Sequence, residues 1–98
     1  MEYVMDGGEM LSFEEAKDEI VRLIEELAAV NTRQHDRQNA DFWHAKASEV
    51  RALHETDVAA FAGACCKMAV PVDIYDSGHL VCQFTLHNGS WKCCYPEN

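Results

Sequence analysis

By residue type, the side chains in this sequence most able to do chemistry are five cysteines and five histidines. Structural zinc sites favour cysteines separated by two to four residues, because that spacing lets two thiolates converge on one tetrahedral ion. Here the cysteines are Cys65–Cys66, Cys82 and Cys93–Cys94, and adjacent cysteines on a strand point to opposite faces. We therefore expect Cys65, Cys82 and Cys93 to pack as small apolar residues, and Cys94 to be the exposed thiol.

The histidines show no ligand spacing either. They are His35, His44, His54, His79 and His87, with no HExxH motif and no pair four residues apart. The nucleophile elbow, the phosphate-binding loop and the dinucleotide fingerprint are also missing. The sequence thus predicts no catalytic residue, no metal ligand and no cofactor. A cysteine-dependent metal-binding or redox protein stays open as the alternative.

Negative charge is the other chemical signal. The formal net charge is −9, and residues 1–30 carry nine acidic side chains against Lys17 and Arg22. Direct binding of nucleic acid needs clustered Lys and Arg to neutralise phosphates, so this balance argues against it. An acidic surface favours basic partners instead.

The helical part of the chain carries most of these acids. Between Gly8 and Gly63 there is no Gly or Pro, so long helices are expected. Ser12 and Glu15 have capping-box spacing, and an apolar stripe at three- and four-residue steps then predicts a helix over 13–30. Asp41 is the predicted N-cap of a second helix. Thr56 or Asp57 is the predicted N-cap of a third, which Pro71 ends.

After residue 70 the apolar period changes from 3.6 to 2, which predicts a sheet. Asn88-Gly89 is a strong two-residue hairpin signal that places Leu86 opposite Trp91. A three-residue loop at 76–78, with Gly78 left-handed, is favoured for the preceding turn because it pairs apolar with apolar residues. The residues expected on the core face are Leu80, Cys82, Phe84, Leu86, Trp91, Cys93 and Tyr95.

Together these elements predict a single α+β domain over residues 1–98. Three N-terminal helices are followed by a three-stranded antiparallel β-meander packed on them. Residues 1–11 are flexible or a short edge strand, 12–70 form the helical part, and 71–95 form the meander. No apolar run approaches the ~20 residues of a membrane span. The N-terminus lacks the pattern of a secretory signal, so we expect a cytoplasmic protein with reduced thiols.

The function expected from this sequence is that of a small acidic protein-interaction module, not an enzyme. It would bind a basic surface of a partner protein, such as a nucleic-acid-handling enzyme, and inhibit or adapt it. Phage-encoded anti-CRISPR inhibitors and immunity proteins offer an analogy of size and charge only. An acidic housekeeping domain, whose charge only keeps it soluble, is the plain alternative. The predicted partner-binding residues are Glu14, Glu15, Asp18, Glu19, Glu25 and Glu26. The alternative surface is the outer sheet face with Tyr75, His79, Gln83, His87 and Lys92.

Overall fold

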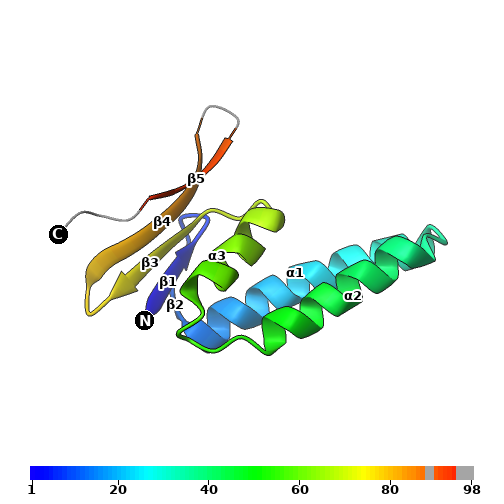
Figure 1. The fold of residues 1–98 in the computed structure, drawn as a ribbon, viewed down its shortest axis with the longest axis horizontal. Helices are drawn as coiled ribbons and strands as arrows, with labels where there is room; N and C mark the ends of the chain where they lie inside the picture. The colour runs from blue at the N-terminus through cyan, green and yellow to red at the C-terminus, as the bar shows by residue number, and fades with distance from the viewer. Residues whose placement is uncertain (88–89, 95–98) are drawn as a thin grey trace.

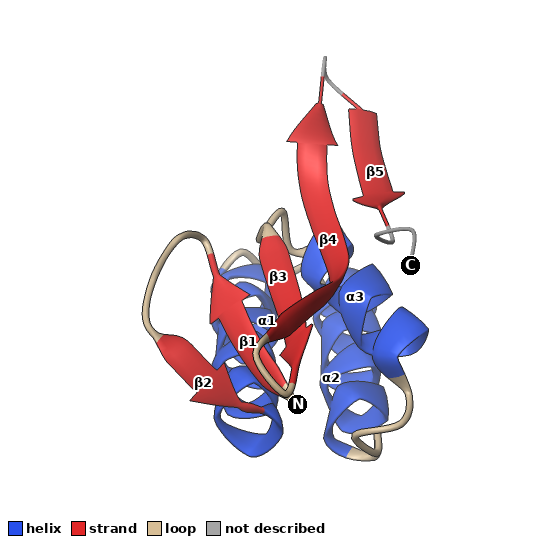
Figure 2. Ribbon diagram, turned by 90° about the vertical axis from the view of Figure 1, so that its left-hand side faces the viewer, coloured by secondary structure: helices blue, strands red, loops and turns tan. Residues whose placement is uncertain are grey.

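Two strands precede the first helix. The structure, a computed structural model, describes residues 1–87 and 90–94, with the side chains of residues 1–83. The elements are β1 (Glu2–Met5), β2 (Met10–Ser12), α1 (Phe13–Arg33), α2 (Arg37–Arg51), α3 (Val58–Lys67), β3 (Val72–Asp76), β4 (His79–His87) and β5 (Ser90–Cys94). The strands form one antiparallel sheet in the order β2-β1-β3-β4-β5, with the helices on one face (Figure 1 and Figure 2). The expected order of three N-terminal helices and then a three-stranded meander is therefore wrong, because a β-hairpin opens the chain and the sheet has five strands.

The opening hairpin is closed by Asp6 and Gly7. Both have positive φ, 52° and 71°, as in a type I′ turn, and the Gly8 N–H donates to the Met5 carbonyl at 3.0 Å. The segment expected to be flexible or a short edge strand thus supplies β1, which lies inside the sheet, and β2, which forms its edge. The hairpin also fixes the position of Glu9 beside the start of α1.

The capping box predicted for α1 is confirmed. The Glu15 N–H donates to the Ser12 hydroxyl at 3.2 Å, and the Ser12 N–H donates to the Glu15 carboxylate at 3.0 Å. α1 runs on to Arg33, and His35 then adopts a positive φ of 59°. Asp36 caps α2 by accepting a bond from the Asn39 N–H, so the N-cap predicted at Asp41 is wrong.

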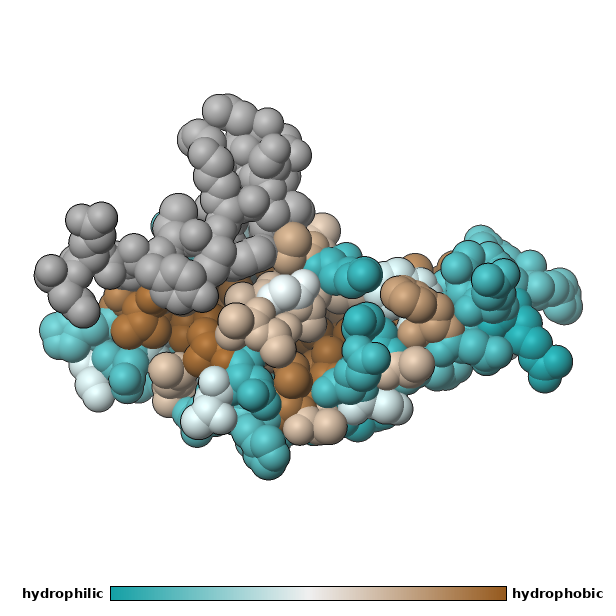
Figure 3. Space-filling model, in the orientation of Figure 1, coloured by the Kyte–Doolittle hydropathy of each residue, from teal (hydrophilic) through white to brown (hydrophobic). Residues whose placement is uncertain are grey.

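The two long helices form an antiparallel hairpin that extends past the sheet (Figure 1). The molecule measures 49 × 30 × 21 Å as a result. Residues 31–39 include no buried side chain, and the far end of the hairpin presents a polar surface (Figure 3). This exposed position explains why residues 31–39 are all polar although α1 and α2 continue into this segment. None of the helices in the described residues combines the length and apolar character of a membrane span.

The core lies between the helices and the covered face of the sheet. Tyr3, Phe13 and Phe61 form its centre, with ring centroids 5.2 to 5.7 Å apart. Cys65 and Cys82 are 0% and 1% exposed, so the prediction that they pack as apolar residues is confirmed. The side chains of Cys93 and Cys94 lie outside those that are described.

The turn between β3 and β4 differs from the predicted one. Ser77 and Gly78 both have positive φ, 52° and 81°, and the turn pairs Tyr75 with Leu80, so the loop has two residues rather than three. A bulge follows, in which Ile74 faces Cys82 and Val81 has no residue opposite it. This extra residue keeps Ile74 in the core. Leu80, expected on the core face, instead shares the outer face with Tyr75.

The predicted register of the last hairpin agrees with the strands as they pair. His87 lies opposite Ser90, and Leu86 lies opposite Trp91. β4 pairs with β3 over its first half and with β5 over its second half, so the β4–β5 hairpin projects past the rest of the sheet (Figure 2). The predicted turn at Asn88-Gly89 and the residue Tyr95 lie outside the described residues.

Candidate functional site

Most of the carboxylates predicted to bind a partner already contact groups of their own chain. Arg22 lies between Glu19 and Glu26 and forms ion pairs with both. Lys17 pairs with Glu14 at 3.2 Å, and Arg51 of α2 pairs with Glu25. In the described part of the chain, Asp18 alone among the six predicted residues has neither an ion pair nor a cap bond.

The capping box also favours the ionised form of Glu15. Hydrogen bonds with the backbone and side chain of Ser12 lower the pKa of Glu15 below its usual range, so its carboxylate stays ionised at neutral pH. Arg22 is held in its charged form by Glu19 and Glu26, which raise its pKa. The acidic face of α1 is therefore ordered but carries less free charge than its sequence suggests.

A groove next to α1 brings two of these carboxylates together with two others. Asp6 and Glu9 of the first hairpin line a space of about 540 Å³ together with Glu15 and Glu19 of α1. Glu15, Glu19 and Leu23 follow one another at four-residue steps and so lie on one side of α1. The apolar residues of the groove are Met5, Leu11, Leu23, Met68 and Val70. No lysine or arginine is among the described residues that line it.

The other predicted residues do not join this site. Glu14 lines a separate hollow together with Lys17 and Arg51, so basic groups accompany it there. Asp18, Glu25 and Glu26 line neither space. Asp6 and Glu9 were missed by the sequence reasoning, although Asp-Gly flanked by apolar residues is a hairpin signal that would have placed them.

The alternative surface on the outer sheet face is divided by the bulge. Tyr75 is half-buried, and Gln83 donates to the Asp73 carboxylate at 3.1 Å. Because His79 pairs with Asp76 in the two-residue turn, it falls on the opposite side from Tyr75. The side chains of His87 and Lys92 lie outside those that are described. The structure therefore does not bring the five residues together.

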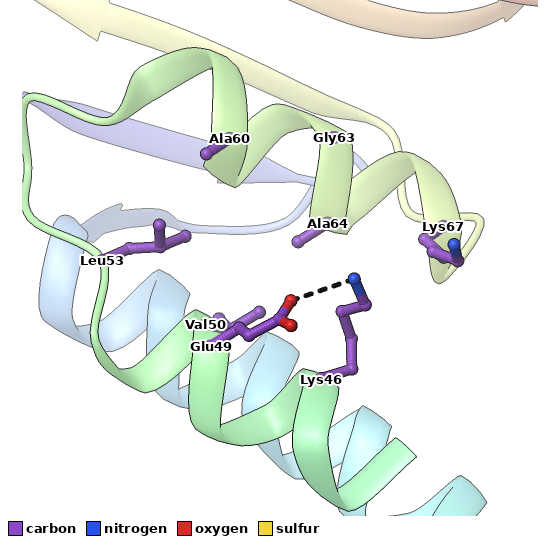
Figure 4. A pocket seen from close by; sticks show the side chains of 8 residues that line it. All are labelled: Lys46, Glu49, Val50, Leu53, Ala60, Gly63, Ala64 and Lys67. Carbon is purple, nitrogen blue, oxygen red and sulfur yellow. Dashed lines mark hydrogen bonds and ion pairs between the residues drawn. The ribbon is translucent and has the colours of Figure 1, made fainter. Parts of the chain in front are cut away.

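A second concavity lies between α2 and α3 (Figure 4). It holds about 240 Å³ and is lined from α2 by Lys46, Glu49, Val50 and Leu53, and from α3 by Ala60, Gly63, Ala64 and Lys67. Leu53 and Ala60 lie at one end, and the two lysines lie at the other. Lys46 forms an ion pair with Glu49 at 3.0 Å.

The described thiols give little support to metal or redox chemistry. Burial raises the pKa of Cys65 to about 12, so the reactive thiolate is disfavoured. Among the described side chains, which are those of residues 1–83, no three His, Cys, Asp or Glu residues are grouped to hold a metal ion.

The chain was compared with known proteins at the level of families, sequences and structures. No family model, curated protein or solved structure matches the chain.

Proposed function

We propose that this protein is a small acidic interaction module that binds a basic, amphipathic segment of a partner protein. The groove between the first hairpin and α1 carries the proposal. Four carboxylates and five apolar side chains line it, so the groove complements a segment that presents apolar side chains flanked by Lys or Arg. Apolar contacts supply binding energy, whereas charge complementarity selects the partner and speeds association.

The fixed geometry of the rim favours binding as well. Glu15 is held by the Ser12 cap, and Glu19 is held by Arg22, so neither carboxylate must be ordered when a partner arrives. Asp6 and Glu9 form no ion pair within the described residues, and both keep their charge available. When the basic segment of the partner binds in the groove, it is no longer accessible to other molecules. An inhibitor or adaptor in the cytoplasm would act in this way.

A binding titration with two charge-matched variants tests the proposal. The probe is a fluorescent peptide of Lys and Leu, with a Glu and Leu peptide as its negative control. One variant removes three of the four groove carboxylates through Asp6→Asn, Glu9→Gln and Glu19→Gln. The other carries Glu14→Gln, Asp18→Asn and Glu25→Gln, which remove the same charge outside the groove.

We expect the groove variant to weaken peptide binding by about tenfold and to flatten its salt dependence, because several charge pairs are lost. The matched variant should bind within about threefold of the native protein. Equal weakening by both variants would mean that net charge alone attracts the peptide. Unchanged binding by both would contradict an acidic docking site.

A further inference from the structure

The cleft between α2 and α3 has a chemistry opposite to that of the acidic groove. Its floor is apolar, since Val50 and Ala64 are buried and Leu53 is half-buried. Lys46 of α2 and Lys67 of α3 both lie at one end (Figure 4). The site thus combines an apolar slot with a cationic end, in a protein whose net charge is −9.

An exposed aromatic ring extends the cationic end. Phe42 is 45% exposed, and the Nζ atoms of Lys46 and Lys67 lie 5.8 and 5.5 Å from its ring centre. The two ammonium groups come from different helices and gather around one ring. Lys67 has no carboxylate within ion-pair distance among the described side chains, so its charge is available to a ligand.

Gly63 helps to keep the slot open. It lies inside α3, where glycine is a poor helix former, and a Cβ added to it would meet no atom within 4 Å. The described fold therefore gives no packing reason for glycine at this position. Its missing side chain leaves room in the cleft on the side that faces α2.

We propose that this cleft binds a short aliphatic chain that ends in a carboxylate. The chain would lie along Val50, Leu53 and Ala64, and the carboxylate would accept hydrogen bonds from the ammonium groups of Lys67 and Lys46. The small volume fits a medium-length chain better than a drug-sized ligand. Glu49 is an internal competitor, because it already occupies Lys46. The site is separate from the acidic groove and does not depend on it.

Titration with a head-group series tests the site. The probes are octanoate, octan-1-ol and octylammonium, followed by calorimetry and by the amide NMR shifts of α2 and α3. We expect saturable binding of octanoate, about tenfold weaker binding of the alcohol, and none of the amine. An apolar peptide with a free or an amidated C-terminus distinguishes a chain end from a free acid as the natural source.

Variants separate a ligand site from a structural role. Lys67→Gln should weaken octanoate binding about tenfold, whereas Glu49→Gln should tighten it, since the competing carboxylate is gone. Gly63→Leu fills the slot and should abolish binding, with circular dichroism confirming that the helices persist. Arg33→Gln, a basic residue outside the cleft, should change nothing. Absence of saturable octanoate binding, equal binding of octylammonium, or no effect of either Lys67→Gln or Glu49→Gln would overturn the proposal.

Discussion

Two titratable side chains are used as packing groups at the centre of the core. Tyr3 and Cys65 are both fully buried, and burial raises the pKa of each to about 12. Tyr3 packs edge-on against Phe61, with ring centroids 5.2 Å apart. Both groups are thus neutral in the fold at ordinary pH, and their ionisation opposes folding.

Alkaline pH should therefore destabilise the protein through these groups. The unfolded chain releases the protons of Cys65 and Tyr3 at their ordinary values, 9.0 and 10.0, whereas the folded chain retains both until about 12. The contribution of these two groups to the free energy of unfolding should accordingly be constant below about pH 8.5 and fall as the pH rises toward 12. Tyr3→Phe keeps the ring but removes the hydroxyl, so urea titrations should show a shallower fall above pH 10. Parallel curves for the two proteins would contradict this assignment.

Lys17 is a structural cation rather than a binding one. Its side chain is only 12% exposed, and its ammonium donates to the carbonyls of Arg51 and Leu53 at 3.2 and 3.4 Å. These carbonyls lie at the end of α2 and just past it, where helical partners are lacking.

We expect Lys17→Met to lower the free energy of unfolding by about 1–2 kcal/mol, because it removes two charge-assisted hydrogen bonds, of which the one to the Leu53 carbonyl is partly buried. Chemical denaturation checks this value. Lys46→Met is the control, since within the described residues the ammonium of Lys46 contacts only the exposed groups Glu49 and Phe42, and its effect should stay below about 0.5 kcal/mol. Equal losses in the two variants would argue that Lys17 contributes only through its aliphatic stem.

A helix-interior glycine gives a third prediction at this scale. Gly63→Ala should raise the free energy of unfolding by about 0.5–1 kcal/mol, because alanine is the better helix former and its Cβ meets no atom. Thermal or urea denaturation measures the gain. A loss of stability would mean that the cleft closes more tightly on α3 than the structure shows.

Among the elements, those with strong local signals were predictable. The capping box and apolar stripe placed α1, and the Asn-Gly step placed the register of β4 with β5. The β3–β4 turn was not predictable from alternation alone. A two-residue turn at Ser77-Gly78 would expose Val72 and Ile74, and the bulge at Val81 that resolves this conflict has no sequence signature of its own.

The connection between α1 and α2 was missed for another reason. Its residues are all polar, so the spacing of apolar residues does not show where the helix ends. The end of α1 is instead defined by backbone hydrogen bonds. The His35 N–H donates to the Thr32 carbonyl at 3.0 Å, and the Asp36 N–H donates to the Asn31 carbonyl at 2.8 Å. These are the two bonds of a Schellman motif, in which residue 35 must be left-handed.

Glycine should consequently suit residue 35 better than histidine. His35 is exposed and has a φ of 59°, so His35→Gly loses no packing and should raise the free energy of unfolding by about 0.5–1 kcal/mol. Gln34→Gly is the matched control, because Gln34 is also exposed but has a φ of −86°. Urea denaturation should show that Gln34→Gly lowers the free energy of unfolding. The same sign of change at both positions would contradict the left-handed cap.

At the scale of the whole molecule, the sequence predicted that the candidate binding surface is negatively charged, but it predicted only part of the location of that surface. The acidic residues of α1 were visible as a row, and Glu15 and Glu19 do line the groove. Two facts needed the fold. Asp6 and Glu9 reach the groove only through the first hairpin, and Arg51 pairs with Glu25 only because α2 packs against α1.

Gathering four carboxylates around one groove should also reduce stability. Their mutual repulsion is felt over distances comparable with the Debye length, so it weakens as salt is added. Asp6→Asn with Glu9→Gln removes half of these charges, and asparagine followed by glycine suits the type I′ turn at residues 6 and 7. We expect the double variant to melt at a higher temperature than the native protein at low salt, and the difference to shrink as the salt concentration rises to about 0.5 M.

Glu14→Gln with Asp18→Asn removes the same charge outside the groove and should give a smaller gain, since Glu14 is offset by Lys17. Equal gains in the two variants would assign the repulsion to net charge instead of to the groove. A lower melting temperature in the groove variant would show that Asp6 and Glu9 stabilise the hairpin.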